Sequence, residues 1–479
     1  MRNFCTLPLN PFLNRLIHCD ESVVNSILLL LRECRSKRSV KQIHVRMLIH
    51  DAPLHNHLLS KLILLNDLHY SLLVFRRIRN PNIFSFNIMI RALATSWKNH
   101  SLAIQFYQRL RLLPLNPDHF TFPFLFISCA NLPSPGNGKA GHALVFKSGL
   151  PNDGHTCHSM ISMYSNLGEL FNARKLFDDI PEKTVVSWNS MISGYAKMGC
   201  SKEAVELFED MKKSGITPDE MTLVSVLSAS GDLGDLKAGN FVEDFVRVNK
   251  MELNKHIGSA LIDLYSKCGE LSMARRIFSE VKHKDVIIWN AMISGYARNG
   301  QPEEAIKLFH SMRVSKCEQN SITIVIALSA CASSAAIELG SWIETYTEQR
   351  GWRDDVYIAT ALIDMYAKSG RLEDSQRVFC STSNKNKATW NAMIAALASH
   401  GRKREALSLF HRMKASGVCP DHVTFVGALS ACVHGGLISE GKGIFNSMEE
   451  HGVAPRVEHY TCVVDMAARA GLIEEAWGG

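Results

Sequence analysis

A fixed interval of 101 residues constrains this chain more than any other feature of its sequence. The dipeptide Trp188–Asn189 returns as Trp289–Asn290 and again as Trp390–Asn391, and each step is 101 residues long. A catalytic core does not repeat itself in this way, whereas a stacked array of small structural units does. The sequence therefore predicts a repeat protein.

The segment Val185–Asp219 predicts a helical hairpin. Its first helix has an apolar stripe at helical spacing and stops at Gly199; the stripe consists of Trp188, Met191, Ile192 and Tyr195. A second helix begins after Ser201, which we expect to be its N-cap, and ends before Gly215. Because neither helix can bury its stripe alone, the hairpins must stack. We expect an all-α superhelical solenoid of helix-turn-helix repeats.

Three kinds of hairpin alternate within each 101-residue period. Val185–Asp219 is a standard repeat of 35 residues, Glu220–Asn254 a long repeat of 35, and Lys255–Asp285 a short repeat of 31. Read in both directions, the same pattern predicts about thirteen hairpins over residues 22–479. The last begins near Glu458, and its second helix is cut short.

Composition excludes several classes of protein. The longest apolar runs fall far short of the roughly 18 residues that a membrane-spanning helix needs. The thirteen cysteines include no CxxC pair, and the group His44, His50, His55 and His57 lacks a carboxylate or thiol to complete a metal site. We therefore expect no membrane, no metal, no cofactor and no small-molecule substrate. The net charge of +7 suits a polyanionic partner but is too mild to identify one.

No catalytic set is visible, so the sequence does not predict an enzyme. Gly136–Gly141 reads GNGKAG, a formal GxGxxG, but no strand precedes it, and Gly138 has the register of the repeat turn at Gly239. The signature of zinc deaminases, His-x-Glu followed by Pro-Cys-x-x-Cys, is missing. Residues 1–21 contain Arg2 and Arg15 and resemble an organelle transit peptide, with an ordinary frayed terminus as the open alternative.

The sequences of the repeats resemble those of the plant pentatricopeptide repeat family, in the subclass that alternates standard, long and short repeats. The segments that carry the resemblance are SWNSMISGYAKMG, IWNAMISGYARNG, ALIDMYAKSG and TFVGALSAC, and it extends over residues 22–479. The resemblance implies that the all-α array is a right-handed superhelical solenoid of helix-turn-helix repeats. It also implies binding of single-stranded RNA, one base per repeat.

In the family pattern, the fifth residue of the first helix and the last residue of the repeat read the base. Transferred to the standard repeats, the pairs are Asn87 with Asp118, Asn189 with Asp219, Asn290 with Asn320, and Asn391 with Asp421. In the short repeats they are Asn56 with Asn82, His158 with Thr184, Ser259 with Asp285, and Thr360 with Asn386. The long repeats pair an apolar residue with a polar one, as in Val224 with Asn254 and Val325 with Asp355, so their bases stay open.

The family code then implies an RNA. Asn with Asp favours uracil, Asn with Asn a pyrimidine, Thr with Asn adenine, and Ser with Asp guanine. From the repeat at Ala52 to the one at Lys387, the bound sequence is Y-U-N-N-U-N-G-Y-N-A-U from 5′ to 3′. The pair His158/Thr184 departs from the code and leaves its base undefined.

Three features have plain structural alternatives. Asn189, Asn290 and Asn391 could simply satisfy free N–H groups at helix starts. The repeated tryptophans are expected in the core. Basic residues recur at positions that face outward in the helical pattern. The plain interpretation is a solvated surface, and the functional alternative is contact with phosphates; the residues are Arg174, Lys175, Arg275, Arg276 and Arg377.

The resemblance favours binding of an organellar transcript, in the mitochondrion or alternatively the chloroplast, to position a cytidine for C-to-U editing. Since the chain stops before any extension or deaminase domain, we expect a deaminase partner in trans. The alternatives are transcript stabilisation or processing by occupancy, and a protein-binding scaffold of the tetratricopeptide kind.

Overall fold

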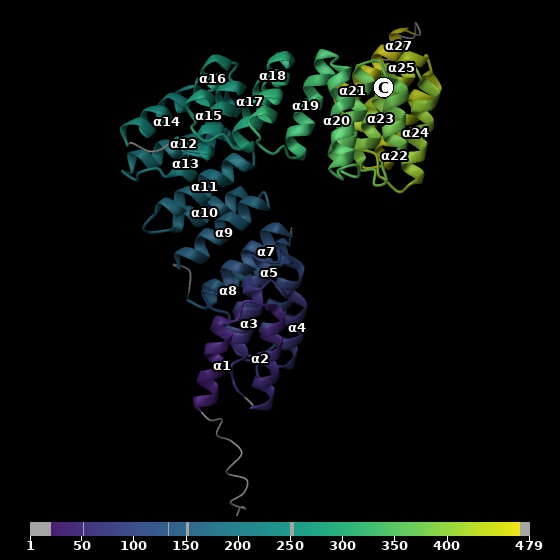
Figure 1. Ribbon diagram of the computed structural model, residues 1–479. Helices are drawn as coiled ribbons and strands as arrows, with labels where there is room; N and C mark the ends of the chain where they lie inside the picture. Colours follow the sequence, from purple (N-terminus) through teal and green to yellow (C-terminus); the bar gives the residue numbers. More distant parts are fainter. Residues whose placement is uncertain (1–20, 51, 133, 150–152, 250–252, 470–479) are drawn as a thin grey trace, which may run out of the picture. The chain divides into compact units, whose positions relative to one another are not determined.

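The structure is a computed structural model, and it describes residues 21–50, 52–132, 134–149, 153–249 and 253–469. The predicted transit peptide, residues 1–21, lies almost entirely outside the described residues, as does the second helix of the last repeat. All the regular structure in the described part of the chain is helical (Figure 1). The prediction of an all-α array of helix-turn-helix repeats is therefore confirmed.

Thirteen helix pairs and one further helix make up the described residues. The first helices of the pairs are α1 (Glu21–Glu33), α3 (His55–Leu64), α5 (Ile83–Ala94), α7 (Phe122–Asn131), α9 (Gly154–Asn166), α11 (Val185–Lys197), α13 (Glu220–Leu233), α15 (Lys255–Lys267), α17 (Val286–Arg298), α19 (Ser321–Ser334), α21 (Val356–Lys368), α23 (Lys387–Ser399) and α25 (His422–Gly435). Their second helices are α2 (Lys37–Ile49), α4 (Leu68–Arg77), α6 (His100–Arg111), α8 (Pro135–Lys147), α10 (Leu170–Asp179), α12 (Ser201–Lys213), α14 (Lys237–Val248), α16 (Leu271–Glu280), α18 (Pro302–Val314), α20 (Ile337–Gln349), α22 (Leu372–Ser381), α24 (Lys403–Ala415) and α26 (Ile438–Glu450), and α27 (Val457–Arg469) follows.

The chain divides into two compact units, residues 1–229 and residues 230–479. Within each unit, a first helix packs against its own second helix and against the first helix of the next repeat, as α9 does with α10 and α11, and α21 with α22 and α23. Figure 1 shows these successive pairs side by side. The first helices therefore form one continuous layer within each unit, and the second helices cover it.

The shortness of the 31-residue repeats has its origin in the second helix. In the short repeats this helix has 10 residues, as in α10, α16 and α22, whereas it has 13 in the standard repeats, as in α12, α18 and α24. The first helices of both kinds, from α9 onward, have 13 residues. About one helical turn is thus missing from the covering layer, while the first-helix layer keeps its length.

The repeated tryptophans belong to the core, as predicted. Trp188, Trp289 and Trp390 are buried. Each packs edge-on against the phenylalanine of the preceding short repeat, with ring centroids 5.0 to 5.2 Å apart; the partners are Phe177, Phe278 and Phe379. Edge-to-face pairs of this kind add to the stabilisation from apolar burial. The tryptophans thus join consecutive repeats.

Two local predictions were wrong. Ser201 is the first residue of α12 and buried, and the N-cap is Cys200, which makes no side-chain cap. Gly138 lies inside α8 and not in a turn. A Cβ there would meet the Met163 sulfur at 2.5 Å, so this glycine permits close approach of α8 to the next repeat. The GNGKAG segment is consequently a helix start with no strand before it.

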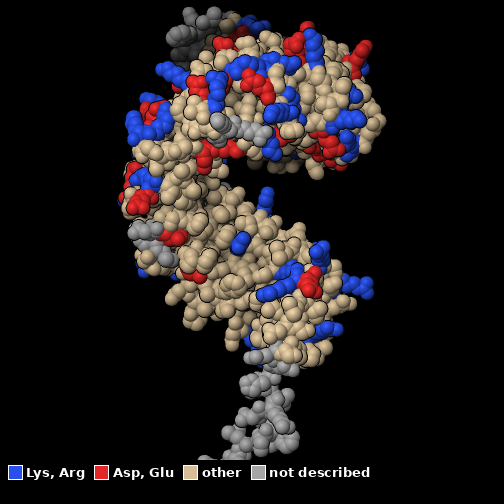
Figure 2. Space-filling view, turned by 60° about the vertical axis from the view of Figure 1, so that its left-hand side comes forward, with Lys and Arg blue, Asp and Glu red and all other residues tan. Residues whose placement is uncertain are grey.

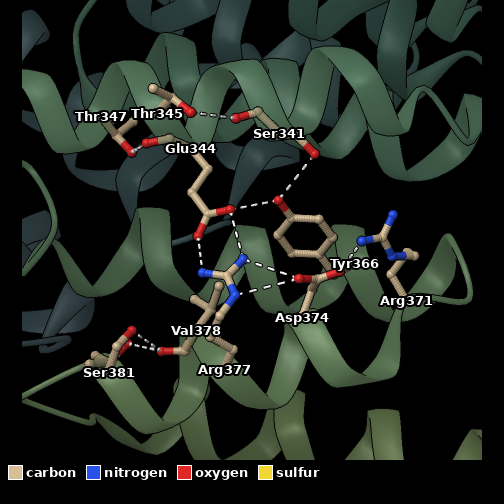
Figure 3. Close-up of polar contacts among 11 residues, drawn as sticks. Ser341, Glu344, Thr345, Thr347, Tyr366, Arg371, Asp374, Arg377, Val378 and Ser381 are labelled. Atoms are coloured by element: carbon tan, nitrogen blue, oxygen red, sulfur yellow. Dashed lines mark hydrogen bonds and ion pairs between the residues drawn. The ribbon is translucent and has the colours of Figure 1, made fainter.

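A polar network joins each of two long repeats to the following short repeat. Arg377 on α22 donates two hydrogen bonds to Glu344 on α20, at 2.8 and 3.0 Å, and Tyr366 on α21 donates a third at 2.6 Å (Figure 3). Burial and the bond to Glu344 raise the pKa of Tyr366 to about 12. Burial acts to raise the pKa of Glu344, but the bonds from Arg377 and Tyr366 outweigh it and lower that pKa.

The same network occurs one period earlier, where Tyr265 and Arg276 both bind Glu243. These arginines are among the residues for which phosphate contact was the functional option. Both are held in ion pairs between helices, so the structure favours a structural role for them.

Candidate nucleic-acid interface

The structure brings the two predicted reader residues of every standard repeat into direct contact. The Asn87 side-chain nitrogen lies 2.9 Å from Asp118 Oδ1, and that of Asn391 lies 3.0 Å from Asp421 Oδ1. Asn290 and Asn320 make the longest contact, at 3.3 Å. The sequence separation is 30 or 31 residues, so stacking of consecutive repeats creates each pair.

Helix capping in these pairs is performed by the last residue of the repeat, not by the fifth. Asn320 and Asp421 are the N-caps of α19 and α25, and their Oδ1 atoms accept the backbone N–H of the third helical residue. The interpretation of Asn189, Asn290 and Asn391 as capping residues is therefore wrong. Their side chains lie across the gap between adjacent first helices.

The fifth residues are largely buried. Asn87, Asn189, Asn290 and Asn391 expose only 5 to 9% of their surface. A base can therefore reach only the outer edge of each amide. Burial acts to raise the pKa of Asp219, but hydrogen bonds from the Thr222 N–H, the Asn189 amide and the Thr222 hydroxyl outweigh it and lower that pKa. The residue is a carboxylate at neutral pH.

In three of the four short repeats, the two predicted residues are joined through a third side chain. The Ser85 hydroxyl lies 2.7 Å from Asn56 Oδ1 and 2.8 Å from Asn82 Oδ1. Ser187 joins His158 to Thr184 at 3.0 and 3.3 Å, and Thr389 joins Thr360 to Asn386 at 3.0 Å on both sides. Asn56 is the second residue of α3, because that helix begins three residues later than the repeat does.

The pair Ser259/Asp285 is not brought together in this way. The Ser259 hydroxyl donates to the His256 carbonyl oxygen at 3.1 Å, and Asp285 caps α17 and lies 3.6 Å from the Lys255 ammonium. The residue in the position of Ser187 and Thr389 is here the fully buried Ile288.

These pairs have different hydrogen-bonding edges. In Asn87/Asp118 the Oδ1 of Asp118 accepts the capping bonds, and Oδ2 accepts no bond from the described residues. A free acceptor beside an amide donor complements uracil, which has an N–H next to carbonyl oxygens. In Asn290/Asn320 the Asn320 Oδ1 is occupied in the same way, so its NH₂ is the group left for a ligand. Two donors complement cytosine, which has acceptors at N3 and O2.

Our sequence reasoning missed two sets of residues at this face. One is the hydroxyl residue at the third position of the following repeat, such as Thr222, which contacts both members of the Asn189/Asp219 pair. The sequence does indicate this position, because a threonine recurs there at the 101-residue interval, as Thr121, Thr222, Thr323 and Thr424.

The other set is a row of exposed apolar side chains at the second position of the repeats. They lie three residues before the fifth position and so on the same helix face; they are Phe84, Phe120, Val186, Met221, Ile287, Ile322, Tyr357 and Val423. Beside Thr360, a cavity of about 380 Å³ opens between Tyr357, Ala388 and Val325. Such apolar walls can hold the flat faces of bases.

Positive charge is concentrated in the first hairpins of unit 1. Residues 21–150 contain sixteen Lys and Arg but only five Asp and Glu, whereas residues 151–479 contain 35 and 40. Within the described residues, the basic side chains of this segment make two ion pairs, Lys41 with Asp67 and Lys139 with Glu169. On the face drawn in Figure 2, the lower end of the molecule shows Lys and Arg with few Asp or Glu. The modest net charge of the chain conceals this asymmetry.

The described residues hold no group of three or more His, Cys, Asp or Glu placed to bind a metal ion, and His44 instead lies 2.9 Å from the Tyr70 hydroxyl. None of the described helices combines the length and the apolar content that crossing a bilayer requires.

Comparison with family models gives matches over much of the array. A model described as "PPR repeat family" matches residues 183–230, 284–333 and 385–434, and one described as "PPR repeat" matches residues 155–185, 259–286, 357–384 and 423–453.

Relatives in Arabidopsis thaliana match along most of the chain. The mitochondrial pentatricopeptide repeat-containing protein At2g22410 is 35% identical over 86% of this chain and 66% of its own length. The chloroplastic protein At1g08070 is 39% identical over 85% and 60%, and At4g38010 is 36% identical over 87% and 75%. The chain thus spans about 60 to 66% of the length of several of these relatives.

Among solved structures, the fold matches that of the pentatricopeptide repeat protein PPR10, crystallised in complex with an 18-nt psaJ RNA element. The TM-score is 0.55 at 18% sequence identity, and the match covers 97% of this chain and 81% of that one. At this identity the likeness shows the fold alone, which is an α-solenoid.

Proposed function

Because this chain belongs to the pentatricopeptide repeat family, we propose that it binds single-stranded organellar RNA in a sequence-specific manner, one base per repeat, and positions a cytidine of that transcript for C-to-U editing by a deaminase supplied in trans. The observation that carries the RNA-binding part is the contact between Asn and Asp or Asn in each standard repeat. It recurs in the four standard repeats and leaves one defined polar edge in each of them. Two of the relatives are named mitochondrial and chloroplastic, and they support an organellar location.

The chemistry of each unit follows from its exposed groups. The outer edge of the Asn and its partner would bind the Watson–Crick edge of a base, while the apolar second-position residues would contact its faces. The basic first hairpins would neutralise phosphates. A peptide-binding scaffold has no need of a polar pair that recurs in every standard repeat, so this arrangement favours RNA over the protein-binding alternative.

The binding test uses an RNA that contains Y-U-N-N-U-N-G-Y-N-A-U and a scrambled RNA of equal composition. We expect at least tenfold tighter binding of the designed RNA, since each well-matched base contributes on the order of 1–3 kcal/mol of discrimination. Equal affinity for both RNAs would remove the base assignments. Absence of RNA binding even at low salt would favour the scaffold.

Editing and simple occupancy call for a different measurement, because both use the same bound RNA. Organellar transcripts from a line lacking this protein should be sequenced for C-to-U sites and mapped for their ends. Loss of conversion at one site that lies 3′ of the bound sequence is the result expected from editing. Unchanged conversion with altered transcript ends or abundance would replace editing by stabilisation or processing.

A further inference from the structure

A buried hydroxyl at the third position of the following repeat lies between the two residues in seven of the eight predicted reader pairs. We propose that this hydroxyl is a positioning residue for base selection: it fixes which end of the fifth residue's side chain faces the RNA. The inference rests on the proposed RNA-binding function and names a specificity determinant that the two-residue pairing leaves out.

The geometry is the same in every standard repeat. Thr323 Oγ1 lies 2.8 Å from Asn290 Oδ1 and 2.9 Å from Asn320 Oδ1, and the corresponding threonine contacts its fifth-position oxygen at 2.5 to 2.6 Å in the other three. All four threonines are fully buried. A hydroxyl hydrogen directed at Oδ1 holds the Asn carbonyl inward. The NH₂ is thereby held toward the last residue and the open edge.

The hydroxyl is not needed for capping, as the long repeats that begin at Glu220 and Ser321 show. Asn254 and Asp355 are N-caps that accept the N–H groups of Ile257 and Ile358, and these third-position isoleucines have no hydroxyl. Capping therefore does not require the hydroxyl. In both of these repeats the fifth residue is a valine, Val224 or Val325, which has no polar end to orient.

Seven of the eight predicted reader pairs, by contrast, have Ser or Thr at this position; these residues are Ser85, Thr121, Ser187, Thr222, Thr323, Thr389 and Thr424. The exception is Ile288 beside Ser259 and Asp285, and the Ser259 hydroxyl there is bonded to its own helix. A polar fifth residue and a buried hydroxyl thus occur together in seven of these repeats.

The hydroxyl should affect base selection most in the pair whose own contact fixes the fifth residue least. Asn290 and Asn320 are 3.3 Å apart, and Asn320 has both a donor and an acceptor in its side chain, so the pair alone does not strongly fix the Asn290 amide. At Asn189 the carboxylate of Asp219 accepts from the amide with both oxygens at 2.9 Å and already determines its orientation. Thr323 is therefore the residue to change.

The test compares Thr323→Val, which removes only the hydroxyl, with Thr323→Ser, which keeps it. Affinity is measured for four RNAs that differ only at the eighth base of the predicted sequence. The wild type should discriminate among them by about tenfold or more. Thr323→Val should reduce that ratio to about twofold, and Thr323→Ser should restore it.

Thr156→Val is the matched control. Thr156 is fully buried and bonds the Asp153 carboxylate at 2.5 Å, but the preceding repeat has Pro123 at its fifth position and no side chain to orient. Both valine variants should lower the melting temperature, yet Thr156→Val should leave the ratios at the eighth base unchanged.

Each result has one meaning. If the wild type discriminates and Thr323→Val retains the same ratios while weakening all four RNAs equally, the hydroxyl is only structural and the inference is wrong. If the wild type itself shows no preference at that base, the assignment of Asn290/Asn320 as a reader fails instead.

Discussion

The side-chain nitrogen of Asn189 lies 2.9 Å from both carboxylate oxygens of Asp219, and the two residues are the fifth and the last of one repeat. This pair offers a donor beside acceptors. Replacing Asp219 by Asn keeps its shape and its capping oxygen but turns the outer acceptor into a donor, as in the natural pair Asn290/Asn320. We expect preference at the fifth base to move from uracil to cytosine, with about 1–3 kcal/mol of discrimination.

Fluorescence anisotropy with RNAs that differ only at the fifth base measures this change. Asp210→Asn is the control, because Asp210 is an exposed residue of α12 that pairs with Lys213. It should leave the preference unchanged. A uracil preference that survives in Asp219→Asn would contradict the donor and acceptor assignment.

The network around Glu344 predicts a measurable contribution to stability. Glu344 is only 15% exposed and binds both Arg377 and Tyr366, so Glu344→Gln removes the shorter of the two ion pairs of Arg377 and leaves the one to Asp374, at 3.3 Å. We expect a loss of about 1–2 kcal/mol in the free energy of unfolding, less than for a fully buried pair because Arg377 is half-exposed. Chemical denaturation of the single and double variants with Arg377→Met gives the coupling energy.

Lys368→Met is the comparison for that cycle. Lys368 pairs with Asp364 on the surface of α21, and both side chains are more than 40% exposed. Its loss should change stability by less than about 0.5 kcal/mol. A cycle with no coupling between Glu344 and Arg377 would mean that the contact in Figure 3 contributes nothing.

His142 occupies the position of Glu243 and Glu344 in the first period and lies 2.7 Å from the Tyr164 hydroxyl. Burial and the charge of Lys175 lower the pKa of this imidazole. Between that pKa and about 6.5 the unfolded chain binds more protons than the folded one, so this residue makes stability rise with pH over that window. We expect His142→Glu to add about 0.5–1 kcal/mol at pH 7, through Tyr164 and Lys175, and to remove this histidine's share of the pH dependence.

Thermal denaturation of both proteins at pH 5, 6 and 7 tests this substitution. His69→Glu, on the exposed face of α4, is the control and should alter neither the stability nor its pH dependence by more than about 0.5 kcal/mol. A His142→Glu protein less stable than the wild type at pH 7 would show that Lys175 does not take the place of Arg276.

The excess of positive charge in residues 21–150 predicts where the salt dependence of RNA binding originates. Arg76, Arg77 and Arg79 are exposed at the end of α4, next to the reader Asn82. Changing all three to Gln should reduce the slope of log K against log salt by up to about 2, if each neutralises one phosphate of a single strand. Affinity titrations between low and physiological salt provide the slope.

The control for these arginines is a triple Gln variant of Lys202, Lys212 and Lys213 on α12, which are paired with acidic residues of their own helix. Its slope should change by less than about 0.5. Equal changes in the two triple variants would mean that charge counts along the chain do not locate the RNA backbone.

Periodicity was sufficient to predict the helices and the core, because an apolar stripe at helical spacing must be buried between stacked hairpins. The register of the repeats also brought Asn189 to Asp219 across 30 residues. Periodicity did not predict the structural role of every recurring residue. Gly138 and Gly199 both recur at 101 residues, but one allows two helices to approach and the other, with a φ of 74°, terminates a helix. Periodicity does not separate a packing requirement from a backbone requirement.

The hydroxyls at the third position were overlooked for a similar reason. A Ser or Thr three residues after Asn or Asp has the ordinary appearance of a capping sequence, and Asn320 with Thr323 does form a capping box. Only the distance from Thr323 to Asn290, in the preceding repeat, reveals the second contact. That contact depends on the offset between stacked helices, which local sequence does not encode.

The second helices α10, α16 and α22 are about one turn shorter than those of the standard repeats. The number of residues in a repeat and the distance between successive reader pairs therefore depend on different helices. The distance between one reader and the next depends on how the 13-residue first helices stack. The number of residues in each repeat depends on the length of its second helix. If each repeat binds one base, as proposed, we expect a short repeat to advance along the RNA as far as a standard one.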